Sequence, residues 1–313
     1  MLLNCSQILI KITDENTPLN TPILAYPRFN AISNKSYVII GGLGGLGLEL
    51  ADWLVLRGAK NLVIVSRNGI QTGYQKLRTE TWKSYGTKIL IISGVDASKT
   101  DDCEFILKSA EKQAAVDGIF NLAAVLKDCL MVNQTVESFE ESMKPKAMIT
   151  KKLDELSRKI CPKLRHFVVF SSLSCGRGTP GQTNYGMGNA VLERICERRI
   201  EEGFPGMAIQ WGAVGDVGLA AEMLENKQQL VIGGTLPQKI SSCLEEMDKF
   251  LCQSRPIVAS MVVAEKRFSA KEVSNVLEAV MNIMSTFIHL QFNLHVIILF
   301  FYYRYKGYKN CEP

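Results

Sequence analysis

A glycine-rich segment constrains the fold of this chain more than any other feature. Residues 41–47 (GGLGGLG) directly follow the apolar run 37–40 and lead into leucines at helical spacing. Glycines between a strand and a helix permit a tight turn, close approach of backbone to a pyrophosphate and close helix packing. The helix N-terminus adds free N–H groups and a positive dipole. We therefore predict a dinucleotide-phosphate loop, with a ligand-free glycine turn as the alternative, formed by Gly41, Gly42, Leu43, Gly44, Gly45 and Leu46.

Six short apolar runs alternate with amphipathic stretches from Ser36 onward. Parallel strands that are buried on both faces have continuous Val, Ile and Leu runs, and strands that alternate with helices are typical of βα units. The pattern predicts an α/β fold with a doubly wound parallel sheet, and a helix and loop region over 220–265. The predicted strands cover residues 37–40, 62–65, 88–92, 118–122, 167–170 and 207–210.

Composition excludes several function classes. A net charge of +5 on 313 residues is too mild for a nucleic-acid binder, which carries a concentrated basic face. Three histidines, His166, His289 and His295, leave little material for a metal site or a Ser-His-Asp triad. Nine cysteines without a C-x-x-C pair indicate reduced thiols. We expect no metal, no nucleic-acid partner and a cytoplasmic location.

The two ends of the chain differ from its middle. Residues 1–10 are apolar but lack the basic start of a secretory signal. The apolar run 294–303 is shorter than the roughly 20 residues that span a bilayer, which favours a non-native or truncated tail over a membrane anchor. We predict the end of a preceding domain plus a linker over 1–35, the main domain over 36–266, and a truncated helical module with an apolar tail over 267–313.

Cofactor choice follows from residues at the ends of the predicted strands, where ligands bind in such sheets. Ser66 and Arg67 end the second strand, and an arginine there can bind a 2′-phosphate, so NADPH is favoured over NADH. A surface arginine at this position by chance is the alternative. Asp96 ends the third strand and is expected to face the adenine. Asn121 and Ala123, at the end of the fourth, are expected beside the nicotinamide half.

The fifth strand leads into a pattern that resembles a known superfamily. Ser172 and Tyr185 stand thirteen positions apart, as in the short-chain dehydrogenases/reductases. Simple members carry a lysine four positions after the tyrosine, where this chain has Asn189. The exchange resembles the ketoreductase domains of fatty acid and polyketide synthases, whose lysine comes from upstream. The lysine that aligns in this chain is Lys146.

Further stretches are similar to animal type I fatty acid synthase, namely 41–53, 125–128, 211–218 and 231–236. The resemblance covers roughly residues 36–266. It implies a Rossmann-like 3-oxoacyl-[acyl-carrier-protein] reductase, which uses NADPH to reduce a 3-oxoacyl thioester to the 3-hydroxyacyl thioester. It also implies an acyl carrier with a phosphopantetheine-linked substrate, other synthase domains and a possible homodimer as partners. A polyketide synthase ketoreductase and a catalytically silent fragment that binds NADPH are the alternatives.

The ends of the chain resemble the neighbours of that domain. The first 35 residues are similar to the end of an enoylreductase domain, and residues 271–284 to the opening of an acyl carrier domain. The carrier's Asp-Ser-Leu attachment site is absent from the sequence. We therefore do not expect this chain to work as a loaded carrier.

The chemistry of ketone reduction gives each candidate residue a role. Hydride addition leaves an alkoxide, so a proton donor must stand beside the carbonyl oxygen, and Tyr185 is the candidate. Moving a phenol from a pKa of about 10 toward about 7 takes roughly 4 kcal/mol, much of which the Lys146 ammonium can supply. Lys146 and Tyr185 are also expected to contact the cofactor, Lys146 at the nicotinamide ribose. Ser172 would donate a hydrogen bond to the substrate oxygen. Asn189 would hold a backbone carbonyl or a proton-relaying water. The nearby Lys144, Lys151 and Lys152 are alternatives to Lys146 for its role.

Residues 144–165 carry a surplus of positive charge. This segment holds eight Lys and Arg residues against two acidic ones. A solvated helix face is the simpler interpretation. The alternative hypothesis is a docking surface for an acidic acyl carrier, which would steer the substrate to the site.

Overall fold

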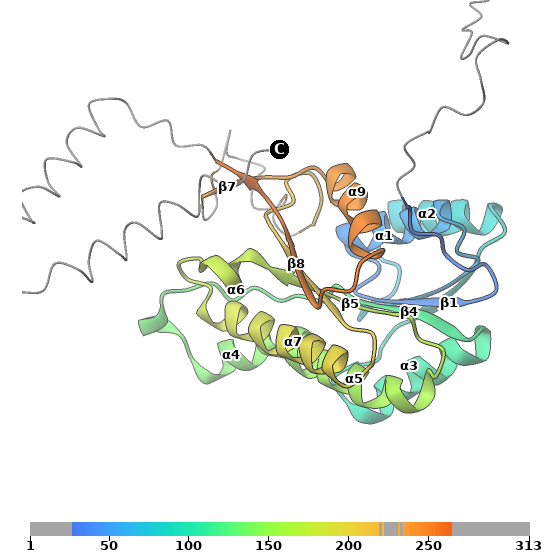
Figure 1. The fold of residues 1–313 in the computed structure, drawn as a ribbon, viewed down its shortest axis with the longest axis horizontal. Helices are drawn as coiled ribbons and strands as arrows, with labels where there is room; N and C mark the ends of the chain where they lie inside the picture. Colours follow the sequence, from blue (N-terminus) through green and yellow to red (C-terminus); the bar gives the residue numbers. More distant parts are fainter. Residues whose placement is uncertain (1–26, 219–220, 222–230, 232–233, 265–313) are drawn as a thin grey trace, which may run out of the picture. The chain divides into compact units, whose positions relative to one another are not determined.

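The computed structural model describes residues 27–218, 221, 231 and 234–264. Figure 1 shows one sheet with helices on both of its faces. The predicted parallel α/β fold is confirmed, because seven strands pair in parallel in the order β3-β2-β1-β4-β5-β6-β8. The strands are β1 (Ser36–Ile40), β2 (Asn61–Val65), β3 (Lys88–Ile92), β4 (Val116–Asn121), β5 (His166–Ser172), β6 (Met207–Trp211) and β8 (Ile257–Ser260).

Two groups of helices cover the sheet (Figure 1). One face is covered by α1 (Gly45–Leu56), α2 (Gly73–Ser84) and α9 (Ile240–Phe250), and the other by α3 (Thr100–Gln113), α5 (Ile149–Ile160) and α7 (Thr183–Glu201). Shorter elements carry the connections: η1 (Met131–Asn133), α4 (Val136–Met143), η2 (Lys144–Met148) and α6 (Leu173–Arg177). A small antiparallel pair joins β7 (Thr235–Leu236) to β9 (Val262–Val263).

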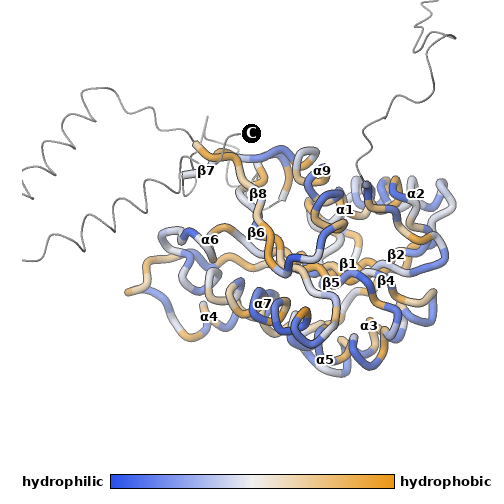
Figure 2. Tube along the Cα trace, viewed as in Figure 1, coloured by the Kyte–Doolittle hydropathy of each residue, from blue (hydrophilic) through white to orange (hydrophobic). Residues whose placement is uncertain are grey.

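The central strands divide their side chains between two cores, because successive residues of a strand point to opposite faces. In β1, Tyr37 and Ile39 belong to the core beneath α1 and α9, whereas Val38 and Ile40 belong to the core beneath α3, α5 and α7. All five residues of this strand are buried. Figure 2 shows apolar strands between helices that carry hydrophilic segments. Continuous apolar runs are therefore the right signal for these strands.

Strand β8 was not predicted from the sequence. It pairs with β6 at the edge of the sheet, within a range for which the sequence predicts only helix and loop. It has four residues, and only Ser260 is buried. A short, half-exposed edge strand has no continuous buried run, so its sequence carries little signal.

The strand order determines where a ligand can bind. β1 lies between β2 and β4, so the connections on its two sides run in opposite directions and leave a crevice at the carboxyl ends of these strands. The compact unit that contains this sheet ends at Val263. The predictions for residues 1–26 and 267–313 concern parts of the chain outside the described residues. Within the described ranges, no helix is long and apolar enough to cross a membrane.

Candidate active site

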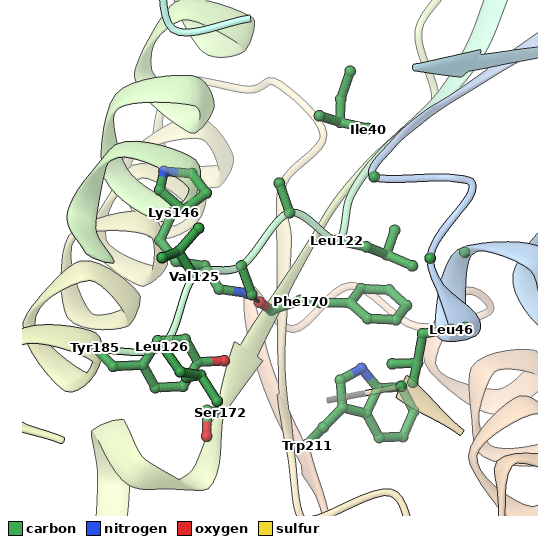
Figure 3. Close-up of a pocket in the computed structure, with 18 of the residues that line it drawn as sticks. Ile40, Leu46, Leu122, Val125, Leu126, Lys146, Phe170, Ser172, Tyr185 and Trp211 are labelled. Atoms are coloured by element: carbon green, nitrogen blue, oxygen red, sulfur yellow. Dashed lines mark hydrogen bonds between the residues drawn. The ribbon is translucent and has the colours of Figure 1, made fainter. Parts of the chain in front are cut away.

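A cavity of ≈ 980 Å³ opens at the carboxyl ends of the central strands. Its lining runs from the glycine loop to the start of α7, and Figure 3 shows Lys146, Ser172 and Tyr185 on one side of it, with Leu46 and Trp211 on the other. Three predicted residues, Gly42, Asn121 and Asn189, lie outside this lining. The predicted residues within it are Gly41, Leu43, Gly44, Gly45, Leu46, Ser66, Arg67, Asp96, Ala123, Lys146, Ser172 and Tyr185.

The glycine loop brings backbone close to backbone. Gly41 has a φ of 80°, a left-handed conformation that side chains disfavour. A Cβ on Gly47 would lie 2.5 Å from the Gly41 carbonyl oxygen, and one on Gly42 would lie 2.9 Å from the Ile64 side chain. Gly42 thus packs beneath the loop and supports the turn without facing the cavity.

The N-terminus of α1 is open to an anion. Its N-cap, Gly44, offers no side-chain cap, and the first turn contains no acidic residue. Among the described residues, the first amides of the helix therefore lack a side-chain partner, and Gly44, Gly45 and Leu46 all line the cavity. This donor set fits the pyrophosphate of a dinucleotide, because a helix N-terminus combines N–H donors with a positive dipole.

Two predicted residues for the adenosine half differ in their surroundings. Arg67 is exposed at the end of β2 and forms no ion pair within the described part of the chain. Asp96 instead pairs with Lys144 at 2.7 Å. Burial alone would raise the pKa of Asp96, but hydrogen bonds from Lys144 and Ser98 outweigh it and lower this pKa to about 2. Asp96 is therefore ionised and partnered at neutral pH.

Asn121 supports the site from behind. Its amide nitrogen donates to the Pro145 carbonyl at 3.1 Å and to the Thr150 hydroxyl at 3.0 Å, and its oxygen accepts from the Ala123 amide at 3.1 Å. The side chain is therefore occupied in holding η2 and α5 against β4. The sequence predicts that Asn121 and Ala123 both lie beside the cofactor. Ala123 lines the cavity, but Asn121 does not.

Lys146 enters the site from η2, a π-helical turn that contains Pro145. Such turns are frequent at functional sites. The Lys146 side chain is buried, its Nζ donates to the Phe170 carbonyl at 2.7 Å, and this nitrogen lies 5.5 Å from the centre of the Tyr185 ring. Burial lowers the pKa of Lys146 to about 7. The competing Lys144 is directed to Asp96 instead, so the structure brings Lys146, and not Lys144, beside the tyrosine.

Tyr185 retains its proton in this environment. Burial is the largest influence and raises the pKa of Tyr185 to about 12, the charge of Asp128 acts in the same direction, and hydrogen bonds with Asn189 and Ser172 oppose the rise. The sequence-based expectation of a phenol moved toward about 7 is therefore wrong for this arrangement, because desolvation of the phenolate outweighs the stabilising contacts. A protonated phenol is the form that a proton donor requires.

Ser172 and Asn189 have distinct positions around this tyrosine. Ser172 ends β5 and caps α6, with its hydroxyl oxygen accepting from the Ser174 amide at 3.2 Å. Asn189 is fully buried in α7, and its amide nitrogen donates to the Tyr185 backbone carbonyl at 2.9 Å. The Asn189 side-chain oxygen has no partner among the described residues. Ser172 thus lines the cavity, whereas Asn189 lies behind the tyrosine.

Several residues of the site were missed by sequence reasoning. Asn184 donates to the Lys127 carbonyl at 3.0 Å and accepts from the Tyr185 amide at 2.7 Å, which anchors the start of α7. Phe170 and Trp211 form an aromatic wall of the cavity, with ring centres 5.7 Å apart (Figure 3). Asn184 directly precedes Tyr185 in the sequence, and this position is a signal that could have identified it. Phe170 and Trp211 lie in apolar strand runs, so their sequence context indicates only a place in the core.

The basic surplus of residues 144–165 is not one solvated face. Lys146 is buried, Lys144 pairs with Asp96, and two arginines are also committed to carboxylates. Arg158 binds Asp154 at 2.7 Å, and Arg165 binds Asp117 at 2.6 Å. The exposed lysines that remain for a docking surface are Lys151, Lys159 and Lys163. In the described part of the chain, no cluster of His, Cys, Asp or Glu is arranged to hold a metal ion.

The fold and the site together define an oxidoreductase of the short-chain dehydrogenase/reductase type. Residues 35–216 match the family model described as the KR domain. The chain belongs to this family of ketoreductase domains. KR domains of this superfamily bind nicotinamide cofactors.

The relatives that match this chain include polyketide synthases from fungi. The chain is 34% identical over 218 residues to a squalestatin hexaketide synthase from Phoma sp., which covers 69% of this chain and 8% of that protein. It is 30% identical over 234 residues to highly reducing polyketide synthase 40 from Fusarium mangiferae, covering 72% and 9% of the two chains. The chain thus spans about a tenth or less of the length of these relatives. They do not specifically support the fatty acid synthase type expected from the sequence.

Solved structures support the same fold. The structure of A-type ketoreductases from a modular polyketide synthase superposes with a TM-score of 0.68 at 24% identity, covering 78% of this chain and 50% of that one. The first ketoreductase of the tylosin polyketide synthase gives a TM-score of 0.66 at 24% identity, with 76% and 50% covered. At this identity the likeness shows a shared fold.

Proposed function

We propose that this chain reduces a 3-oxoacyl thioester to the 3-hydroxyacyl thioester with NADPH, as the ketoreductase of a polyketide synthase. The proposal rests on one observation: Lys146, Ser172 and Tyr185 line the same cavity, which extends to the glycine loop. The fungal relatives favour a polyketide context over the fatty acid synthase that the sequence resembles. The reduction itself would be the same in both.

The residues present fit NADPH. The open N-terminus of α1 would hold the pyrophosphate, and Arg67, which has no carboxylate partner in the described ranges, would bind the 2′-phosphate. Asp96 would face the adenine side together with Lys144, and Ala123 would line the nicotinamide side. When bound, NADPH would supply the hydride for the carbonyl carbon.

The side chains of the site would manage the charge and the proton. Ser172 would donate a hydrogen bond to the substrate oxygen as negative charge develops there. Tyr185, held protonated by burial, would transfer its hydroxyl proton to that oxygen. Lys146 would stabilise the resulting phenolate once it carries a proton, and its pKa of about 7 makes that charge accessible at neutral pH. The side-chain oxygen of Asn189, which has no partner in the described part of the chain, would accept a hydrogen bond from a proton-relaying water.

The substrate would arrive as a thioester on the phosphopantetheine arm of an acyl carrier. The exposed lysines 151, 159 and 163 would favour an acidic carrier surface. The seven cysteines of the described residues are all unpaired thiols, which is compatible with a cytoplasmic synthase. Other synthase domains, and a second copy of the chain, are further proposed partners.

The test is NADPH oxidation by the purified chain with a short 3-oxoacyl thioester or trans-1-decalone. Wild type should oxidise NADPH only when the ketone is present. Tyr185→Phe should bind NADPH as tightly as wild type while turnover falls at least about 100-fold, within the range that a general acid contributes. NADPH binding without turnover by wild type would support the catalytically silent alternative. Full turnover by Tyr185→Phe would contradict the proposed proton donor.

A further inference from the structure

A buried carboxylate stands behind the proposed site, on the side of α7 that faces the sheet. Glu193 follows Tyr185 by eight positions, about two helical turns, and is 3% exposed. One of its oxygens accepts from the Ser171 hydroxyl at 2.5 Å and from the Gln210 amide at 2.9 Å. The other accepts from the Cys175 thiol at 3.4 Å. Among the described residues Glu193 forms no ion pair, so its partners are neutral donors.

These three donors surround the turn that carries Ser172. Ser171 directly precedes this serine in β5, and Cys175 lies in α6, which Ser172 caps. Gln210 is the register partner of Ser171 on β6. A Cβ on Gly176 would lie 3.1 Å from the Gln210 side-chain oxygen, so the turn also rests against this amide. One carboxylate therefore joins β5, α6 and β6 on both sides of Ser172.

The free-energy cost of burying the Glu193 carboxylate indicates that this residue has a specific role. Burying a carboxylate without a cation is expensive, and only hydrogen bonds compensate the lost hydration. Glu193 does not line the cavity, so it has no contact with the substrate there. Satisfied buried networks hold a single geometry. Burial, together with the charge of Glu193, raises the pKa of Cys175 to about 12, which keeps this side chain a thiol donor in the network.

We propose that Glu193 is a positioning residue, which holds the turn 171–176 so that the Ser172 hydroxyl faces the same part of the cavity as Tyr185. This inference rests on the proposed reductase function. It assigns Glu193 an effect on the rate of reduction, exerted through Ser172, and no effect on cofactor affinity. The glycine loop and Arg67, which would hold the cofactor, belong to other elements of the fold.

The test is a double-mutant cycle in the full chain. Glu193→Ala should lower kcat about 10- to 100-fold, less than the 100- to 1,000-fold typical when an oxyanion donor is removed outright. The NADPH dissociation constant should stay within about twofold. In a Ser172→Ala background, Glu193→Ala should add less than about threefold, because residues that act through one another are not additive. Glu193→Gln keeps one acceptor oxygen and should recover kcat to within about fivefold of wild type.

The matched control is Asp117→Asn, which alters another buried carboxylate at the opposite, amino-terminal end of β4. It should lower thermal stability without a selective loss of kcat. If Glu193→Ala does not fold, Ser171→Ala removes one donor, keeps the carboxylate and should give a smaller kcat loss with the same dependence on Ser172. A kcat loss that is equal with and without Ser172, or a parallel loss of NADPH affinity, would overturn the proposal.

Amide hydrogen exchange separates this inference from the proposed function. In Glu193→Ala, or in Ser171→Ala in its place, the amides of residues 172–176 should exchange about tenfold faster than in wild type, while those of β1 remain unchanged. If wild type shows no reduction at all, the proposed function fails, and the exchange result still decides whether Glu193 holds the turn. Unchanged exchange at 172–176 would refute the positioning role.

Discussion

Replacing Lys146 by methionine should make the protein more stable at neutral pH and abolish its reductase activity. The side chain is 2% exposed, and burial lowers its pKa from 10.5 to about 7. At about 1.4 kcal/mol per unit of pKa, the full shift is worth roughly 5 kcal/mol, and about 4 kcal/mol of this cost remains at pH 7, where the buried amine is half deprotonated. Methionine removes that cost, but it leaves the Phe170 carbonyl without the Nζ donor, a loss of about 1–3 kcal/mol. We expect a net gain of about 2 kcal/mol at pH 7.

The stability difference between wild type and Lys146→Met should change with pH in a defined direction. Because the folded pKa of Lys146 lies below the unfolded value, the unfolded wild-type chain binds more protons between pH 7 and 10.5. The stability of wild type therefore rises with pH across this window, relative to the methionine variant. By pH 10 the cost of burying the amine falls to about 1 kcal/mol, so the advantage of the variant should disappear.

Urea unfolding of wild type and Lys146→Met at pH 7 and pH 10 measures both effects, with NADPH oxidation recorded in parallel. Lys144→Met is the control, because this lysine is half exposed and makes a surface ion pair with Asp96. It should change the free energy of unfolding by less than about 1 kcal/mol at both pH values. A methionine variant at position 146 that is less stable than wild type at pH 7, or a difference that does not shrink by pH 10, would refute the reasoning.

Two further predictions concern the cofactor side. Arg67→Ala should raise the KM for NADPH about 10- to 100-fold and leave the KM for NADH nearly unchanged, because a charge-assisted contact to the 2′-phosphate is worth about 1.5–3 kcal/mol. Initial rates with each cofactor measure both KM values, and an equal rise in the two values would contradict the prediction. Gly47→Ala should destabilise the fold by about 1–3 kcal/mol, since its Cβ would lie 2.5 Å from the Gly41 carbonyl oxygen. Gly73→Ala is its control, because no atom of the described residues lies within 4 Å of the added Cβ. Thermal melts of equal midpoint for the two variants would rule out the close-packing argument.

The strands could be predicted from the sequence because burial on both faces leaves a continuous apolar run, as in β1 and β2. The half-exposed β8 lacks this signal. For the site, the sequence predicts which residues lie at the strand ends, but it does not predict the direction or the partners of their side chains. Asn121 lies at the end of β4, but its side chain binds η2 and not a ligand, and Asp96 forms an ion pair with a lysine from another element.

The missing part of the site depends on contacts between distant segments. The choice between Lys144 and Lys146 is made by the π-helical turn η2, which the local sequence does not announce. A glutamate in an amphipathic helix reads as a solvent-facing residue, so Glu193 gives no sign of its burial. The motifs also did not distinguish a fatty acid synthase from a polyketide synthase. The stretches that resemble a fatty acid synthase occur in a chain whose reported relatives are fungal polyketide synthases.

The amine and the phenol of this site arrive on separate segments, η2 and α7. Where a lysine follows its tyrosine by four residues on one helix, the helical repeat fixes their spacing. In this chain the spacing is set by how two segments lie against each other. Evolution or a protein engineer can therefore retune the reach of the amine without redirecting the phenol, a freedom that the one-helix layout does not provide.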